Sequence, residues 1–220
     1  NKNTALLVGM GGNYTSKVGT VNTITNSAFS SVTGYGIWTR GTIGTIGGNT
    51  TVTSTGSDAV WVANSGVINT ISGGTFTGGT AGNGLWISDG GTVGTISGGT
   101  FSSTGTAGLK VDTNSKINFI TGGTFNGVIV NGTIDSISGG TFDFTSYKSS
   151  YNTIKNFVAS GKVARLDSQS GGGKFTVVNN SGITSGTYMS APSCADGYSA
   201  TQGTTSINGE TFTTYTVGVA

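Results

Sequence analysis

One short phrase recurs along the middle of this chain: an aliphatic residue, two further residues and a second aliphatic residue. In the copies that follow one another most clearly, the second aliphatic residue is an isoleucine, and successive copies are 22, 25, 25, 24 and 17 residues apart. A period of this length indicates a repeat protein in which each copy stacks on the next. The isoleucines are Ile24, Ile46, Ile71, Ile96, Ile120 and Ile137.

Two other phrases keep the same period. A Gly-Gly-Thr-Phe phrase follows the isoleucine in most copies, and a third phrase has the form apolar–any–apolar. Each phrase is too short to be stable alone, but it can hydrogen-bond to its copy one coil away at about 4.8 Å. We therefore expect an all-β fold, a single-stranded parallel β-helix (β-solenoid) with about 22–25 residues per coil.

The shortest step supports the solenoid. Between Ile120 and Ile137 the loop after Phe125 is shortened, yet all three phrases remain. A solenoid tolerates such a deletion because a corner loop lies outside the stacked strands.

The composition by itself suggests a flexible, low-complexity segment, since 41 of 220 residues are glycine and only 8% are charged. The regular period argues against that interpretation. We expect four segments: an N-terminal strand or cap over 1–17, with the strand at 4–8, a solenoid core over 18–146, a helix-containing connection over 147–173, and C-terminal β coils or a β-type cap over 174–220.

One short helix is predicted near 150–160. Ile154, Phe157 and Val158 fall on one helical face. Ser149 or Ser150 can cap its beginning, and Gly161 can end it.

The residue types exclude several function classes. The chain has no histidine and one cysteine, so it cannot build a His-dependent catalytic triad, a His-ligated zinc site or an internal disulfide. Ten Lys and Arg against eight Asp and Glu give a net charge of +2, too weak for nucleic-acid binding. No apolar stretch is long enough for membrane insertion. No cofactor or metal is implied.

The acidic residues do not predict an active site. Most of them lie in turns, at different positions of the repeat. Asp89 and Asp112 come closest to forming a pair on adjacent coils, beside Lys110, but their positions in the repeat differ by one residue. Aspartates in turns usually bind nearby backbone, so we do not expect an enzyme.

Alternation along the isoleucine phrase predicts a Thr/Ser face, because neighbours of inward residues point outward. Such an array could bind ice or another crystalline surface, or could simply be exposed β residues that stack on their copies. Phe119 and Gly47 interrupt it. Its members are Thr23, Thr45, Thr70, Thr95, Ser72 and Ser97.

Alternation along the third phrase predicts an aromatic stripe that contains all three tryptophans of the chain. Exposed aromatic stripes often bind sugars or proteins. Two other interpretations remain open: the rings stabilise one another by stacking, or a flanking loop covers them. The stripe consists of Trp38, Trp61, Trp86, Lys110 and Ile129.

The repeated phrase at 70–76 and 95–101, Thr-Ile-Ser-Gly-Gly-Thr-Phe, resembles repeats in secreted surface proteins of anaerobic, gut-type Gram-positive bacteria. The tail motifs Ser-Gly-Thr-Tyr at 185–188 and Ala-Asp-Gly-Tyr at 195–198 are similar to the element that ends such repeat blocks. The resemblance implies an extracellular or cell-surface, right-handed β-helix with an adhesin-like or structural role.

Three functions follow as hypotheses. The first is a non-enzymatic extracellular adhesin-like β-solenoid that presents side-chain ladders to a glycan or a protein surface. The second is a structural subunit whose copies stack end to end into a filament, because open solenoid ends are pairing edges. The third is an ice-binding protein that uses the Thr/Ser face.

Overall fold

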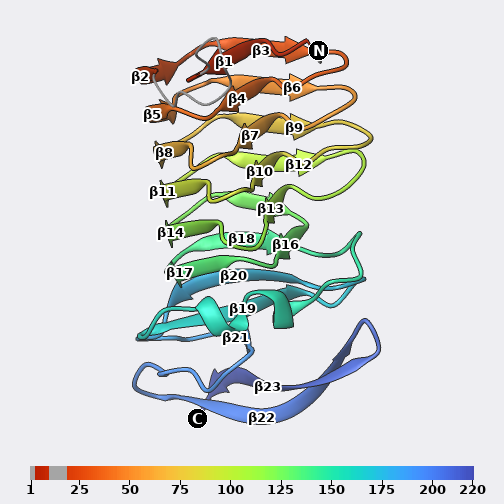
Figure 1. The fold of residues 1–220 in the computed structure, drawn as a ribbon. Coiled ribbons are helices and arrows are strands. Elements are labelled where there is room, and N and C mark those ends of the chain that lie inside the picture. The colour runs from red at the N-terminus through yellow and green to blue at the C-terminus, as the bar shows by residue number, and fades with distance from the viewer. Residues whose placement is uncertain (1–2, 10–18) are drawn as a thin grey trace.

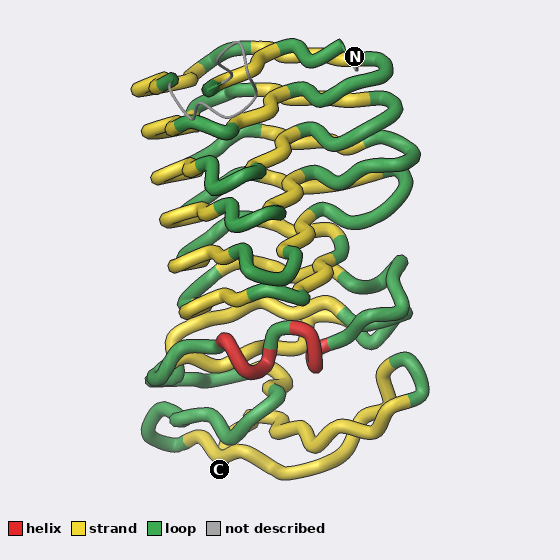
Figure 2. Tube along the Cα trace, viewed as in Figure 1, coloured by secondary structure: helices red, strands yellow, loops and turns green. Residues whose placement is uncertain are grey.

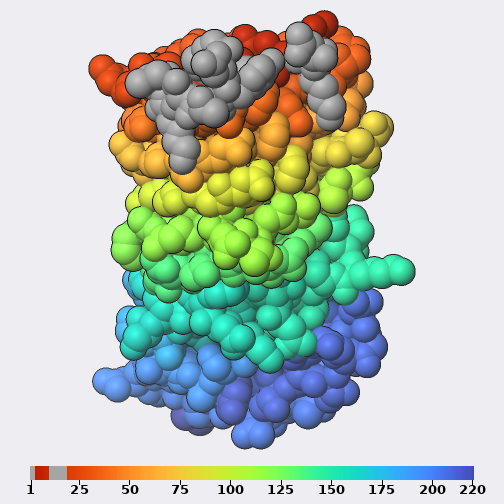
Figure 3. All heavy atoms as spheres, viewed as in Figure 1, coloured from red at the N-terminus to blue at the C-terminus, as the bar shows by residue number. Residues whose placement is uncertain are grey.

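The computed structural model describes residues 3–9 and 19–220. Within these residues, three parallel sheets wind around one core, and the coils stack along a single axis (Figures 1 and 2). In the space-filling view, successive stretches of the chain form bands across the visible face (Figure 3). The predicted parallel β-helix is confirmed.

Sheet A is built from the apolar–any–apolar phrases. Its strands pair in parallel, each with its copy one coil away, as in Leu85 beside Val60 and Leu109. β1 corresponds to the strand predicted at 4–8, whereas residues 1–2 and 10–17 of the predicted N-terminal segment lie outside the described residues. The strands are β1 (Leu6–Val8), β4 (Ile37–Thr39), β7 (Val60–Val62), β10 (Leu85–Ile87), β13 (Leu109–Val111) and β16 (Val128–Val130).

Sheet B is built from the isoleucine phrases, and its strands also pair in parallel. In the phrases after the first, both aliphatic residues are buried although they are three positions apart, as in Ile68 and Ile71. The strand register omits the residue after the first of them, which places both side chains in the core. The strands are β2 (Thr20–Thr25), β5 (Thr42–Gly47), β8 (Val67–Ile71), β11 (Thr92–Ile96), β14 (Lys116–Ile120) and β17 (Thr133–Ile137).

Sheet C begins with the Gly-Gly-Thr-Phe phrases, again in parallel register. Phe76 lies beside Phe101, and Phe101 beside Phe125. The parallel strands are β3 (Ala28–Ser31), β6 (Thr51–Ser54), β9 (Thr75–Gly78), β12 (Thr100–Ser103), β15 (Thr124–Asn126) and β18 (Gly140–Asp143).

The core repeats the same side chain above itself from coil to coil. Four phenylalanines, Phe76, Phe101, Phe125 and Phe142, are fully buried. Their rings stack with centroids 4.8, 5.0 and 5.1 Å apart, close to the spacing between hydrogen-bonded strands. The strand spacing therefore also sets the packing of the core.

The coil with the 17-residue step keeps its three strands. In this coil a single residue, Gly127 with φ of 78°, separates β15 from β16. A Cβ there would clash with the Tyr147 ring, so glycine suits both the backbone angle and the space. The shortened corner loop is therefore confirmed.

The helix predicted near 150–160 is replaced by two single turns of 3-10 helix, η1 (Tyr151–Thr153) and η2 (Lys155–Phe157) (Figure 2). Asn152, Thr153 and Asn156 are poor helix formers, and the hydroxyl of Ser150 binds Glu210 instead of capping the first turn. Ile154 is fully buried, so it lies in the core at the end of the solenoid.

The tail forms a β cap, not further coils. Sheet C continues with antiparallel strands, beginning where Phe142 of β18 pairs with Phe175 of β20. β19 lies inside the segment expected to be a connection, where no strand was predicted. The cap strands are β19 (Lys162–Ser168), β20 (Lys174–Asn179), β21 (Gly186–Tyr188), β22 (Tyr198–Ile207) and β23 (Glu210–Val219).

Candidate functional site

The aromatic stripe is placed on sheet A as the sequence predicts. Trp38, Trp61 and Trp86 are register partners in β4, β7 and β10, and Lys110 and Ile129 continue the row in β13 and β16. All five side chains are half-buried.

The three indoles stack face to face. The centroids of Trp38 and Trp61 are 4.8 Å apart with 15° between the ring planes, and those of Trp61 and Trp86 are 5.0 Å apart at 9°. Tyr35 packs against the first two rings, with centroid distances of 5.6 and 4.6 Å. The Lys110 ammonium lies 5.1 Å from the Trp86 ring centroid. This is a favourable cation–π distance, and the ammonium covers the ring at the other end of the stack.

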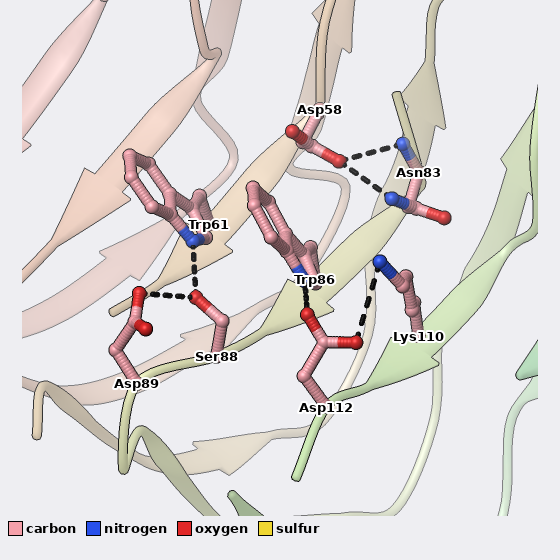
Figure 4. Close-up of polar contacts among 8 residues, drawn as sticks. All are labelled: Asp58, Trp61, Asn83, Trp86, Ser88, Asp89, Lys110 and Asp112. Carbon is pink, nitrogen blue, oxygen red and sulfur yellow. Dashed lines mark hydrogen bonds and ion pairs between the residues drawn. The ribbon is translucent and has the colours of Figure 1, made fainter. Parts of the chain in front are cut away.

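Hydrogen bonds fix two of the three indoles (Figure 4). Trp61 Nε1 donates to the Ser88 hydroxyl at 2.8 Å, and this hydroxyl donates to Asp89 at 3.0 Å. Trp86 Nε1 donates to Asp112 Oδ2 at 2.7 Å, while Asp112 Oδ1 lies 3.3 Å from Lys110 Nζ. The two acceptors occupy equivalent positions: Ser88 comes directly after β10 and Asp112 directly after β13, in each case one coil beyond the indole that they bind.

The third indole lacks this acceptor. Trp38 Nε1 is buried and has no hydrogen-bond partner among the described residues. The residue that follows the sheet A strand of its next coil is Ala63, which has no acceptor in its side chain. Alanine at position 63, where the next two coils have Ser88 and Asp112, therefore leaves the Trp38 N–H unpaired.

This geometry limits what the stripe can bind. Both faces of Trp61 lie against other indoles, so they are not available to the face of a sugar ring. Beyond Lys110, the row ends at Ile129 in a hollow of about 490 Å³ between β16 and the 3-10 turns. The stacking supports the interpretation in which the rings stabilise one another.

The predicted Thr/Ser face lies on sheet B. Thr23, Thr45, Thr70 and Thr95 are register partners on neighbouring strands, and Ser72 and Ser97 are exposed just after β8 and β11. The row is interrupted where expected: Phe119, the next partner of Thr95, is 50% exposed, and Gly47 is buried.

Sheet C carries a more regular hydroxyl array that the sequence interpretation missed. Its first row is continuous over five neighbouring strands: Thr51, Thr75, Thr100, Thr124 and Thr141. A second row, two residues further along each strand, contains Ser30, Thr53, Thr77 and Ser102. The signal was available, because threonines on either side of an inward phenylalanine must point outward.

A shallow groove follows the first row of sheet C. It has a volume of about 550 Å³ and crosses four coils. Five glycines are among its lining residues, and three of them, Gly74, Gly99 and Gly123, have φ near +100°, which side chains rarely adopt. The described residues that line it include no charged side chain: Gly48, Asn49, Thr51, Gly74, Thr75, Gly98, Gly99, Thr100, Gly123 and Thr124.

A buried polar corner joins sheets C and A. Asp58 is 3% exposed, and its Oδ1 accepts hydrogen bonds from the backbone N and Nδ2 of Asn83 at 2.7 and 2.8 Å (Figure 4). Burial and the Asp58 carboxylate raise the pKa of Tyr35 above its ordinary value, while a hydrogen bond with Ser57 opposes this. This corner is internal and lies apart from the groove.

Three further aspartates, Asp89, Asp112 and Asp143, have structural partners. Asp89 and Asp112 bind Ser88, Trp86 and Lys110, and Asp143 accepts a hydrogen bond from the backbone N of Thr145. Residues 3–9 and 19–220 hold no group of three or more His, Cys, Asp or Glu that could bind a metal. They also contain no helix long and apolar enough to cross a membrane.

Comparison with known proteins gives no relative: no family model, no curated protein and no solved structure matches this chain.

Proposed function

We propose that this chain is a non-enzymatic, extracellular, adhesin-like module whose sheet C groove binds an extended, neutral glycan. The observation that carries the proposal is the groove itself, which repeats the same threonine hydroxyl on four successive coils and an equivalent positive-φ glycine on three of them.

The chemistry of the groove matches a polysaccharide chain. Thr51, Thr75 and Thr100 are exposed, and each hydroxyl can both donate and accept a hydrogen bond. The part of the chain that the structure describes places no charged side chain in the groove lining, so the groove suits a neutral ligand better than an anionic one. An extended polysaccharide advances per sugar by a distance similar to the spacing between strands, about 4.8 Å. A ligand that runs along the axis can therefore repeat the same contact on each coil.

Repeated hydroxyl contacts along the groove also raise the affinity for the glycan. A single hydroxyl contact with a solvated sugar is weak, because it replaces hydrogen bonds with water. Four equivalent contacts on one rigid surface act together, since the first contact holds the ligand near the others. The stacked core keeps the rows in place before binding, which lowers the ordering cost.

The test compares two faces that carry the same residue type on the same coils. Thr75→Val with Thr100→Val removes two hydroxyls from sheet C, whereas Thr70→Val with Thr95→Val removes two from sheet B. Affinity electrophoresis against a panel of soluble neutral polysaccharides first identifies a ligand. Its Kd is then measured by calorimetry.

We expect the sheet C pair to weaken binding at least about tenfold and the sheet B pair to leave it unchanged. Trp61→Phe, which keeps the stack but removes one indole N–H, should also leave it unchanged. Equal binding by both threonine pairs, or no binding to any polysaccharide of the panel, would refute the proposal.

A second candidate is binding to an ice surface, which the two rows of sheet C favour because they are more regular than the face on sheet B. Thermal hysteresis measured at about millimolar protein tests it, and its absence would exclude this candidate.

The end-to-end filament receives less support. Coil-on-coil stacking needs an open last coil, but β18 pairs with β20, and Val158 forms a parallel bridge with Ile137 of β17.

A further inference from the structure

The C-terminal edge of sheet C is a long strand with a free outer side. Among residues 3–9 and 19–220, β22 pairs only with β23, and most of its residues are exposed. Figure 1 shows β22 as the last strand of the molecule, on the side away from the solenoid. A strand of ten residues spans about 34 Å, much longer than the three-residue edge strand β16.

The turn of the hairpin determines which backbone groups point outward. Asn208 and Gly209, with φ of 51° and 78°, form a two-residue turn between the paired Ile207 and Glu210. In such a hairpin, Ile207 and every second residue before it bond to β23. The hydrogen bond from the Ala220 N to the Gly197 O follows the same alternation. The N–H and C=O of the intervening residues therefore point away from the sheet: Ala200, Gln202, Thr204 and Ser206.

This edge lacks the features that normally prevent pairing. Natural edge strands carry charges, proline or bulges. Residues 198–207, Tyr-Ser-Ala-Thr-Gln-Gly-Thr-Thr-Ser-Ile, contain no charge and no proline, and their pairing with β23 is continuous.

We propose that two copies of this chain join tail to tail by antiparallel pairing of β22 with β22 of the second copy, about a twofold axis at Gly203. Ala200 then pairs with Ser206 of the other copy, and Gln202 with Thr204. Such an interface is isologous and closes after two copies.

Hydrogen bonding favours this register over an axis through Gln202. The four outward residues, Ala200, Gln202, Thr204 and Ser206, all find partners when the axis passes through Gly203. An axis through Gln202 would pair Ser206 with Tyr198, whose N–H already donates to the Ala195 O, so the Ser206 carbonyl would stay unpaired.

The ends of β22 carry charges of both signs. Exposed Asp196 lies just before the strand, at the Tyr198 end. At the other end lie exposed Lys148, whose carbonyl accepts a hydrogen bond from the Asn208 side chain, and exposed Glu210, whose carboxylate accepts one from Asn152. The edge itself is self-complementary, because every outward backbone group of one copy finds its partner on an identical strand. The partner is therefore a second copy of the chain, and the product is a rod of doubled length.

Sedimentation equilibrium tests the proposal with two variants that differ at one residue. Gln202→Lys with Thr204→Lys places like charges opposite each other twice, and Gln202→Lys with Thr204→Glu places opposite charges there. We expect the wild type to approach twice the chain mass of 21.9 kDa as its concentration rises from about 5 to 500 μM. The opposite-charge variant should dimerise at least about tenfold more tightly than the like-charge variant. Equal unfolding midpoints for both variants verify that the fold is intact.

A cross-link tests the register separately, in a Cys194→Ser background. Gly203→Cys places two cysteines in a non-hydrogen-bonded pair with Cα atoms about 4.5 Å apart, which a disulfide can bridge. Thr205→Cys is the control, because its two copies would be about 13 Å apart. A covalent dimer should form with Gly203→Cys and not with Thr205→Cys. A wild type that stays monomeric at about 500 μM, charge variants of equal affinity, or equal cross-linking at both positions would overturn the proposal.

Discussion

Ala63→Ser should stabilise the protein, because it supplies the acceptor that Trp38 lacks. Ala63 and Ser88 begin equivalent turns, each followed by a residue with φ near 52°, at Asn64 and Asp89. A serine hydroxyl at 63 should therefore lie beside Trp38 Nε1 as the Ser88 hydroxyl lies beside Trp61 Nε1, at 2.8 Å.

The magnitude follows from the unpaired donor. A buried N–H without a partner costs about 1–3 kcal/mol, and a hydrogen bond contributes a net 0.5–1.5 kcal/mol, about 1 kcal/mol on average. The new hydroxyl must itself leave water, which offsets part of the gain. We expect the free energy of unfolding to rise by about 1 kcal/mol, or the Tm by about 2–4 °C in a chain of this size.

The measurement is urea unfolding followed by far-UV circular dichroism, in a double-mutant cycle with Trp38→Phe. Phenylalanine keeps an aromatic ring in the row but has no N–H, so Ala63→Ser should gain nothing in that background. The same change in stability in both backgrounds, or a loss in the wild-type background, would refute the reasoning.

The remaining predictions concern the core, the stack and alkaline stability. Phe101→Ala should lower the free energy of unfolding by about 3–5 kcal/mol, because it opens a cavity between two stacked rings. The control, Phe119→Ala, lies at an exposed site and should change this free energy by less than about 0.5 kcal/mol. Urea unfolding of both variants makes the comparison. Asp112→Ala should cost about 1–3 kcal/mol by the same assay, since it leaves Trp86 Nε1 unpaired, while Asp135→Ala, which breaks only an exposed ion pair with Lys116, should cost less than about 1 kcal/mol. Burial raises the pKa of Tyr151, so its contribution to stability is fully present below the unfolded-state pKa of about 10 and is lost as the pH rises toward the folded-state pKa. Tyr151→Phe should therefore reduce the loss of stability in an alkaline unfolding series, and an unchanged loss would contradict this assignment.

The sequence predicted the parts of the fold that repeat. A constant period implies that equivalent residues stack, and alternation separates inward Ile96 and Phe101 from outward Thr95 and Thr100. The same two rules predict the row of indoles. Only the side-chain hydrogen bonds in the structure show that Ser88 and Asp112 fix two of the indoles, while Ala63 leaves the Trp38 N–H unpaired.

Where the repeat ends, the sequence predicted the β-type C-terminal cap but not how its strands pair. After residue 145 no copy remains to compare, so the reversal from parallel to antiparallel pairing between β18 and β20 left no periodic signal. Ile154, Phe157 and Val158 have helical spacing, yet Ile154 is buried in the core and Val158 bridges β17. Tertiary contacts therefore determined this segment, as they often do when local helix propensity is weak.

In-register stacking of the coils is tested most directly by two distances measured by pulsed electron paramagnetic resonance in a Cys194→Ser background. One pair of spin labels replaces Thr51 and Thr141 on sheet C, and the other replaces Thr45 and Ser136 on sheet B. Each pair is four strand spacings apart, so both should give narrow distributions that correspond to a backbone separation of about 19 Å. Distances that differ between the two pairs by more than one strand spacing would contradict the stacked solenoid and the hydroxyl rows that depend on it.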